Sequence, residues 1–178
     1  MSWRGPSSRI CEVMASVYSI RPAAETDIET LIDFTLREAT EAEGVTLSAE
    51  GATTGVRGGF ATPPLSTYWV AVDATDSIVA STSVVKEWSH CHGGYYWWVQ
   101  SLFILPDHRG SGLVNQLIEH LATVSRSAGA LDLRLYVHSS NRRARRAYSR
   151  CGFANAPYSI MTLTSTGSAP DDDHGRST

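Results

Sequence analysis

A glycine-rich turn, Pro106-Asp107-His108-Arg109-Gly110-Ser111-Gly112-Leu113, joins an apolar run over residues 95–104 to a segment of helical period over residues 110–126. The apolar run is typical of a central strand that is covered on both faces. Pro106 ends this strand, because proline cannot donate a hydrogen bond to a sheet. The later segment repeats large apolar residues every three or four positions, as an amphipathic helix does. The sequence therefore predicts a strand, a tight turn and a helix in this order.

The turn has the composition of a phosphate-binding loop. The first N–H groups of a helix lack partners within the helix, and the helix dipole makes this end positive. Gly110 and Gly112 would let a phosphate approach these groups, and Arg109 adds a positive charge. An ordinary strand-to-helix turn that needs glycine is the alternative. The turn lacks the Gly-Lys-Ser/Thr end of a Walker A loop and the third glycine of a dinucleotide fingerprint.

A second motif follows the turn after about thirty residues, and it is rich in arginine. Tyr148 stands seven positions after Asn141, about two helical turns, so both side chains can address one side of a helix. One interpretation is a second contact with phosphate or with nucleic acid, and the simpler one is a solvated basic face. The arginines of this motif are Arg142, Arg143, Arg145, Arg146 and Arg150.

Short strands and helices are expected on both sides of these motifs. We predict further strands over residues 17–21, 68–72, 78–85, 131–137 and 153–164. We predict helices over residues 24–43 and 141–151, with a second short helix inside the breaker-rich stretch 45–66. Ser139, Ser140 and Asn141 offer N-caps for the last helix. The fold class is therefore α/β, with a mixed sheet.

The chain has 178 residues, which suits one domain. We expect this domain over residues 17–164, after an N-terminal extension over residues 1–16. A tail over residues 165–178, rich in Ser, Gly, Pro and Asp, is expected to be disordered. No apolar run reaches the roughly 18 residues of a membrane span. The three cysteines lack the spacing of a disulfide framework, which favours a reducing, cytoplasmic setting.

The charge argues against general binding of nucleic acid. The net charge is −3, so the chain has no basic excess. Lysine and arginine together number 15, and Lys86 is the only lysine. Adjacent ligands such as His90-Cys91-His92 rarely converge on one ion, so we predict no metal site.

The two motifs together resemble those of the GNAT acetyltransferase superfamily. Arg109-Gly110-Ser111-Gly112 is similar to the loop that binds the acyl-CoA pyrophosphate in this family. The second motif follows the loop at the distance along the sequence that is expected in this family. The central strand Trp97–Ile104 is similar to that of a bacterial subgroup. The resemblance covers residues 18–164 and implies a single-domain protein. Its mostly antiparallel sheet would be splayed between strands 4 and 5 and flanked by helices. The matching positions of the second motif are Asn141, Ala144, Tyr148, Gly152 and Phe153.

The resemblance implies how acetyl-CoA, the co-substrate, would bind. Backbone groups of Leu102, Phe103 and Ile104 would pair with the pantetheine arm as an added strand does. A main-chain N–H of this strand would polarise the thioester carbonyl, and Tyr148 would protonate the departing thiolate. A buried tyrosine with a satisfied hydroxyl is the alternative for Tyr148. The remaining residues expected at the cofactor are Arg109, Gly110, Ser111, Gly112, Leu113, Val114 and Asn141.

The sequence departs from the family at two positions. Val114 stands where the loop motif usually continues with Gly or Ala. Gln100 stands where many members have a glutamate base, and glutamine cannot take a proton. We expect Glu41 and Glu43 to bind the amine or relay its proton, with Gln100 also on the substrate side. The alternative is that both carboxylates are simply solvated groups at the end of the helix.

The resemblance implies an acetyl-CoA-dependent N-acetyltransferase that acts on a primary amine of a small cationic molecule by direct attack in a ternary complex. A protein amine is an alternative acceptor. A second alternative is an acyl-CoA-sensing domain without catalysis, and a third is a nucleic-acid-binding domain that uses the arginine helix. The resemblance and a cluster of aromatic residues make a homodimer plausible. These aromatic residues are Trp88, Tyr95, Tyr96, Trp97 and Trp98.

Overall fold

The computed structural model describes residues 17–61 and 63–163. The extension expected over residues 1–16 and the tail expected over residues 165–178 lie outside the described residues. Within the described part, the five strands are β1 (Ser19–Pro22), β2 (Thr67–Val72), β3 (Ile78–Ser89), β4 (Gly94–Ile104) and β5 (Leu133–Leu135). The four α-helices there are α1 (Ile28–Glu38), α2 (Ala49–Gly59), α3 (Leu113–Ser127) and α4 (Arg142–Arg150).

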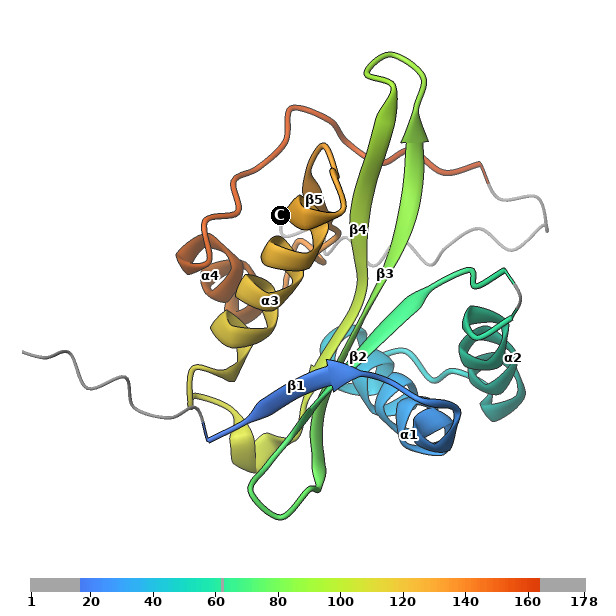
Figure 1. The fold of residues 1–178 in the computed structure, drawn as a ribbon, viewed down its shortest axis with the longest axis vertical. Helices are drawn as coiled ribbons and strands as arrows, with labels where there is room; N and C mark the ends of the chain where they lie inside the picture. Colours follow the sequence, from blue (N-terminus) through green and yellow to red (C-terminus); the bar gives the residue numbers. More distant parts are fainter. Residues whose placement is uncertain (1–16, 62, 164–178) are drawn as a thin grey trace, which may run out of the picture.

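The sheet is mixed and mostly antiparallel, as the sequence predicts. Its strands follow the order β1-β2-β3-β4-β5, and only the pair β4–β5 is parallel. The long hairpin of β3 and β4 extends beyond the other strands (Figure 1). Its register pairs Glu87 with Tyr96.

Strand β4 leaves its neighbour β5 halfway along its length. The two strands pair only from Trp97–Val99 to Leu133–Leu135, whereas β4 continues to Ile104. A β-bulge lies at this point, because Ser83 pairs with Ser101 and Val84 with Val99, so that Gln100 is an extra residue. The predicted splay between strands 4 and 5 is therefore present. It leaves one edge of β4 open beside the turn that leads to α3.

The helices cover the two faces of the sheet. Alternate residues of β2 show the division: Val70 and Val72 pack with α1 and α2, whereas Trp69 packs with Leu121 of α3. Helix α4 lies beside α3, where the Cys151 thiol donates a hydrogen bond to Asn115 Oδ1 (Figure 1). Burial of these apolar side chains fixes both helix layers against the strands.

The helix predicted over residues 24–43 is divided into three parts. A 3-10 turn over Glu25–Asp27 precedes α1, and a π-helical segment over Ala39–Glu43 follows it. Gly44 ends this segment with φ +68°, which is the left-handed conformation that glycine favours. Apolar spacing predicts the helix and its end, but it does not distinguish α from π winding.

The prediction of a strand over residues 153–164 is wrong for the residues that the structure describes. Residues 153–163 contain no strand, and the side chains of Tyr158 and Leu163 are exposed. A strand needs a sheet edge of comparable length with which to pair, and β5, which ends the sheet order, has only three residues. The strand predicted over residues 131–137 is likewise shortened to β5.

Asp27 is a buried carboxylate that ties the start of α1 to β1. Its Oδ2 accepts hydrogen bonds from Arg21 Nη1 at 2.7 Å and from the backbone N–H of Ala24 at 2.8 Å. The hydrogen bond from Arg21, helped by that from Ala24, outweighs desolvation and holds the pKa of Asp27 below its ordinary value.

A lowered pKa in the folded state makes the stability of the protein depend on pH. Asp27 stabilises the fold above its unfolded pKa of about 3.9, and the contribution is lost as the pH falls through the folded value. Between about pH 5 and 2, we expect wild type to lose about 1–3 kcal/mol more unfolding free energy than Asp27→Asn does. Urea unfolding at each pH measures this difference. The exposed Glu119→Gln variant is the control and is expected to follow wild type. Parallel curves for Asp27→Asn and wild type would contradict the role of this carboxylate.

Candidate active site

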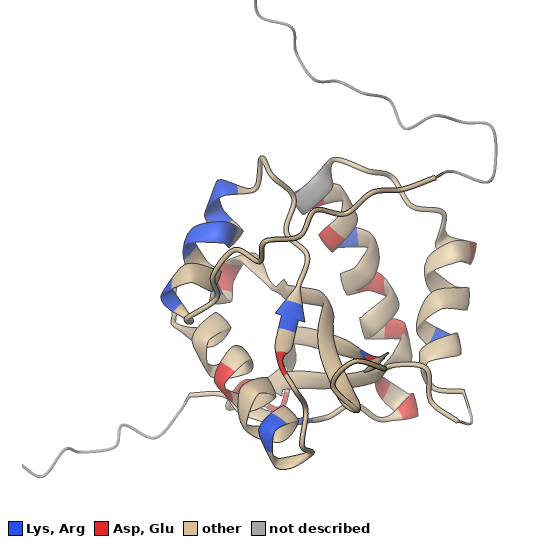
Figure 2. Cartoon of the chain, turned by 90° about the horizontal axis from the view of Figure 1, so that it is seen from above, with Lys and Arg blue, Asp and Glu red and all other residues tan. Residues whose placement is uncertain are grey.

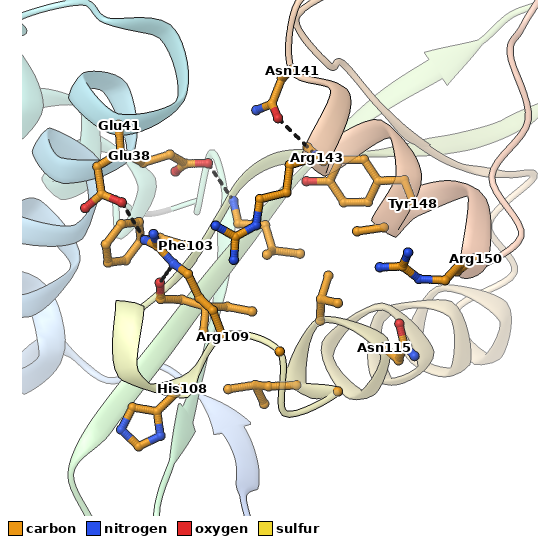
Figure 3. A pocket seen from close by; sticks show the side chains of 18 residues that line it. Glu38, Glu41, Phe103, His108, Arg109, Asn115, Asn141, Arg143, Tyr148 and Arg150 are labelled. Atoms are coloured by element: carbon orange, nitrogen blue, oxygen red, sulfur yellow. Dashed lines mark hydrogen bonds and ion pairs between the residues drawn. The ribbon is translucent and has the colours of Figure 1, made fainter.

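A cavity of about 510 Å³ opens where β4 leaves β5. Its 18 lining residues come from α1 and the π-helical segment, from β4, from the glycine-rich turn with α3, and from α4 (Figure 3). The two sequence motifs, which are separated along the chain, therefore meet at one hollow. The open edge of β4 lies between them.

Most of the residues that the sequence places at the cofactor line this cavity. They are Leu102, Phe103, Ile104, Arg109, Gly110, Gly112, Leu113, Val114, Asn141 and Tyr148. Ser111 does not line it, and the Ser111 hydroxyl instead donates a hydrogen bond to the carbonyl of His108 at 2.7 Å. Of the residues expected on the substrate side, Glu41 lines the cavity. Gln100 is exposed and lies outside the lining, and the side chain of Glu43 is outside the described part of the structure.

The turn presents backbone to the cavity without side chains in the way. Gly110 and Gly112 have φ of +82° and +85°, and a Cβ added to either would meet no atom within 4 Å. The α3 ladder begins with hydrogen bonds from the N–H groups of Asn115 and Gln116 to the carbonyl of Gly112, at 3.0 and 3.3 Å. The N–H groups before Asn115 thus lie at the positive end of the helix dipole. This geometry suits an anionic group.

Helix α4 adds positive charge to the cavity. Figure 2 shows basic residues gathered on this helix. Arg143 and Arg150 line the cavity, whereas Arg142, Arg145 and Arg146 line a separate recess with Ser139. The Asn141 side chain caps the helix by accepting a hydrogen bond from the N–H of Ala144 at 2.9 Å. The expected N-cap is confirmed, and two of the five arginines face the cavity.

Two charged side chains occupy the open edge of β4. The backbone N–H of Leu102 donates to Glu38 Oε1 at 2.9 Å, and the carbonyl of Ile104 accepts from Arg109 Nε at 2.7 Å. Arg109 also donates from Nη2 to Glu41 Oε2 at 2.5 Å. From the sequence, the charge of Arg109 is expected at a phosphate. In the structure this guanidinium is held by Glu41 and by the strand edge.

Sequence reasoning missed Glu38. It is the last residue of α1 and lies three positions before Glu41, so the two residues share one side of the helix. That spacing was the signal that could have identified it. Its contact with Leu102 joins residues 64 positions apart and leaves no local pattern.

Tyr148 projects from α4 into the cavity (Figure 3). Burial, followed by the negative charge of Glu38, raises the pKa of Tyr148 to about 12. Its ring packs edge-on against Phe153, with 5.9 Å between centroids. The hydroxyl is therefore protonated at neutral pH and can act as a proton donor. The pKa of the neighbouring Cys151 is raised by burial, which does not favour a thiolate nucleophile.

Neither a metal site nor a membrane span is found in the described part of the chain. Among residues 17–61 and 63–163, no three His, Cys, Asp or Glu side chains form a group that could hold a metal ion. No helix over the same residues is long and apolar enough to cross a membrane.

A mixed sheet that is splayed over a cavity, with a glycine-rich turn at a helix N-terminus, defines a GNAT-like α/β protein. The sequence model of the acetyltransferase (GNAT) family matches residues 29–153, and the chain belongs to this family. No protein with a curated description matches the chain.

Solved structures of acetyltransferases share this fold. A possible acetyltransferase from Clostridium difficile 630 is 26% identical, with a TM-score of 0.77 over 83% of this chain and 97% of that chain. A predicted acetyltransferase from Clostridium acetobutylicum, solved with acetyl-CoA, is 17% identical, with a TM-score of 0.68 over 82% and 96%. An aminoglycoside antibiotic 6'-N-acetyltransferase from Acinetobacter baumannii is 14% identical, with a TM-score of 0.65 over 84% and 99%.

Proposed function

We propose that this protein is an acetyl-CoA-dependent N-acetyltransferase that transfers an acetyl group to a primary amine of a small cationic molecule. The two-sided cavity is the observation that carries the proposal. Glycine backbone and a helix N-terminus line it on the α3 side, the carboxylates Glu38 and Glu41 line it on the α1 side, and Arg143 and Arg150 line it from α4. The glycine side suits phosphates and the carboxylate side suits an amine, with the β4 edge between them.

The residues present fit acetyl-CoA. The space in front of Gly110 and Gly112 accepts an anion, and the edge of β4 from Leu102 to Ile104 accepts an extended chain as an added strand. When bound, acetyl-CoA supplies an activated acyl group. The N–H of Leu102 polarises its carbonyl, and Tyr148 donates a proton to the leaving sulfur. The neighbour that was solved with acetyl-CoA supports this assignment.

The acceptor is proposed from charge. Glu38 gives the α1 side of the cavity a carboxylate that attracts an ammonium group, whereas the charge of Glu41 is met by Arg109 and Arg37. Among the proteins of this fold are enzymes whose names give aminoglycoside antibiotics as substrates. A small amine with more than one positive charge is therefore the acceptor class we propose. A cytoplasmic location and a homodimer stay predictions.

The test is a thiol-release assay over a panel of polyamines, aminoglycosides, amino acids and peptides, combined with calorimetric titration of acetyl-CoA. We expect micromolar binding of acetyl-CoA and release of free CoA that depends on a small cationic amine. Release with peptides alone would favour a protein amine as acceptor. Binding of acetyl-CoA without release for any amine would support a sensing domain instead. Absence of binding would overturn the proposal.

A further inference from the structure

The structure assigns a double role to Glu38: in the free protein its carboxylate occupies the site that the acyl carbonyl takes later, and once displaced it accepts the proton of the attacking amine. This inference rests on the proposed acetyl transfer. It adds a named proton acceptor and a reason why that acceptor becomes available only when the acyl group has bound.

A hydrogen bond between a side chain and the backbone lies at the open edge of β4. The N–H of Leu102 donates to Glu38 Oε1 at 2.9 Å. On its other edge β4 pairs with β3, where Thr82 lies opposite Leu102. On the open edge, pairing with β5 ends at Val99. One N–H cannot make a good hydrogen bond to a carboxylate and to a thioester carbonyl at the same time. An acyl group that uses this N–H must therefore displace Glu38.

Two carboxylates, Glu38 and Glu41, line the cavity and differ in their contacts. Glu41 Oε2 accepts a hydrogen bond from Arg109 Nη2 at 2.5 Å, and Glu41 Oε1 lies 3.9 Å from Arg37 Nε. Glu38 contacts the very group that the acyl carbonyl requires. The π-helical segment that begins at the next residue interrupts the α-helical register of α1 at this position. Of the two carboxylates, Glu38 is therefore the one that lies at the N–H proposed to hold the acyl carbonyl.

The position of Tyr148 supports this role of Glu38. Both side chains line the cavity, Glu38 from α1 and Tyr148 from α4, and β4 runs between the two helices (Figure 3). The charge of Glu38 acts on the Tyr148 hydroxyl and contributes to its raised pKa. An acyl group at the β4 edge would thus have a proton acceptor on one side and a proton donor on the other.

The transfer then balances. The amine nitrogen forms a bond to the acetyl carbon, and the carbon–sulfur bond breaks with its electron pair on sulfur. The proton lost by the amine goes to the Glu38 carboxylate, and the sulfur receives the Tyr148 proton. The products are an N-acetyl amide and CoA, and solvent restores both side chains to their starting protonation states.

The experiment compares the binding of acetyl-CoA with that of CoA, which lacks the acyl carbonyl. Removal of the carboxylate in Glu38→Ala frees the N–H of Leu102, so we expect the ratio of the CoA Kd to the acetyl-CoA Kd to rise about 10-fold. Glu38→Gln keeps a neutral acceptor of the same shape, and a smaller rise of about 3-fold is expected. In both variants, turnover of the amine is expected to fall about 100-fold or more.

Glu119→Gln removes an exposed carboxylate from α3 and serves as the matched control. Its ratio of the CoA Kd to the acetyl-CoA Kd and its turnover are expected to equal those of wild type. Thermal unfolding checks that each variant is folded. If Glu38→Ala is not folded, Glu38→Gln is used in its place. An unchanged affinity ratio in a folded variant would overturn the displacement. A raised ratio with wild-type turnover would overturn the role as proton acceptor. Wild-type protein that binds neither ligand would instead contradict the proposed function, so the two failures are distinct.

Discussion

Replacement of Tyr148 by phenylalanine is expected to lower kcat about 100-fold or more, while the Kd of acetyl-CoA changes by less than about 2-fold. The substitution removes one oxygen and retains the ring that packs against Phe153. The loss therefore falls on the proton that the leaving sulfur needs. Steady-state kinetics with a saturating amine and calorimetric titration of acetyl-CoA measure the two quantities. Tyr158→Phe changes a hydroxyl on a side chain that is 82% exposed and is the matched control.

The raised pKa of Tyr148 makes this prediction more specific. A tyrosine with a pKa of about 12 stays protonated as the pH rises, and loses its proton only near that value. Wild-type kcat is thus expected to show no decline from loss of this proton between pH 7 and 10. Equal turnover in Tyr148→Phe and wild type would remove the role of this residue as an acid.

Gly112→Trp is expected to weaken acetyl-CoA binding about 100-fold or more. Gly112 has φ +85° and no atom within 4 Å of an added Cβ, so the indole would project into the space proposed for the phosphates. A residue other than glycine with such a φ also costs about 1–3 kcal/mol of backbone strain. Titration of acetyl-CoA measures the loss, and thermal unfolding measures the strain.

Gly129→Trp separates these two effects. Gly129 has φ +71° and equally open surroundings, but it follows the C-terminal end of α3, away from the cavity. The control variant therefore has the same kind of strain without the obstruction, and it is expected to bind acetyl-CoA as wild type does. Equal losses in both variants would mean that strain alone causes them. Normal binding by Gly112→Trp would place the cofactor elsewhere.

Features with a local physical cause could be predicted from the sequence. The proline stop, the two glycines and the apolar period of α3 act within a few residues of one another, and the turn and helix form as they predict. The same holds for the Asn141 N-cap, which bonds three residues ahead. The apolar run over residues 95–104 likewise predicts the strand that forms β4.

Features that depend on distant partners could not be predicted. Arg109 pairs with Glu41 across 68 positions, and Leu102 bonds Glu38 across 64 positions, so no local pattern reveals either contact. The strand expected after Gly152 failed for the same kind of reason. Its residues have strand character, but a strand also requires an edge to pair with, and β5 at the edge of the sheet has only three residues.

The side chains at the open edge of β4 have one more consequence, which concerns other copies of the chain. A strand edge with unpaired N–H and C=O groups is a template for strands of other molecules and promotes aggregation. A binding slot built on such an edge cannot be closed permanently. Glu38 and Arg109 take up the Leu102 N–H and the Ile104 carbonyl with opposite charges, which a neutral peptide strand would have to strip away. A strand of another chain would have to displace both side chains by backbone contacts alone, whereas acetyl-CoA is expected to bind the glycine-rich turn as well.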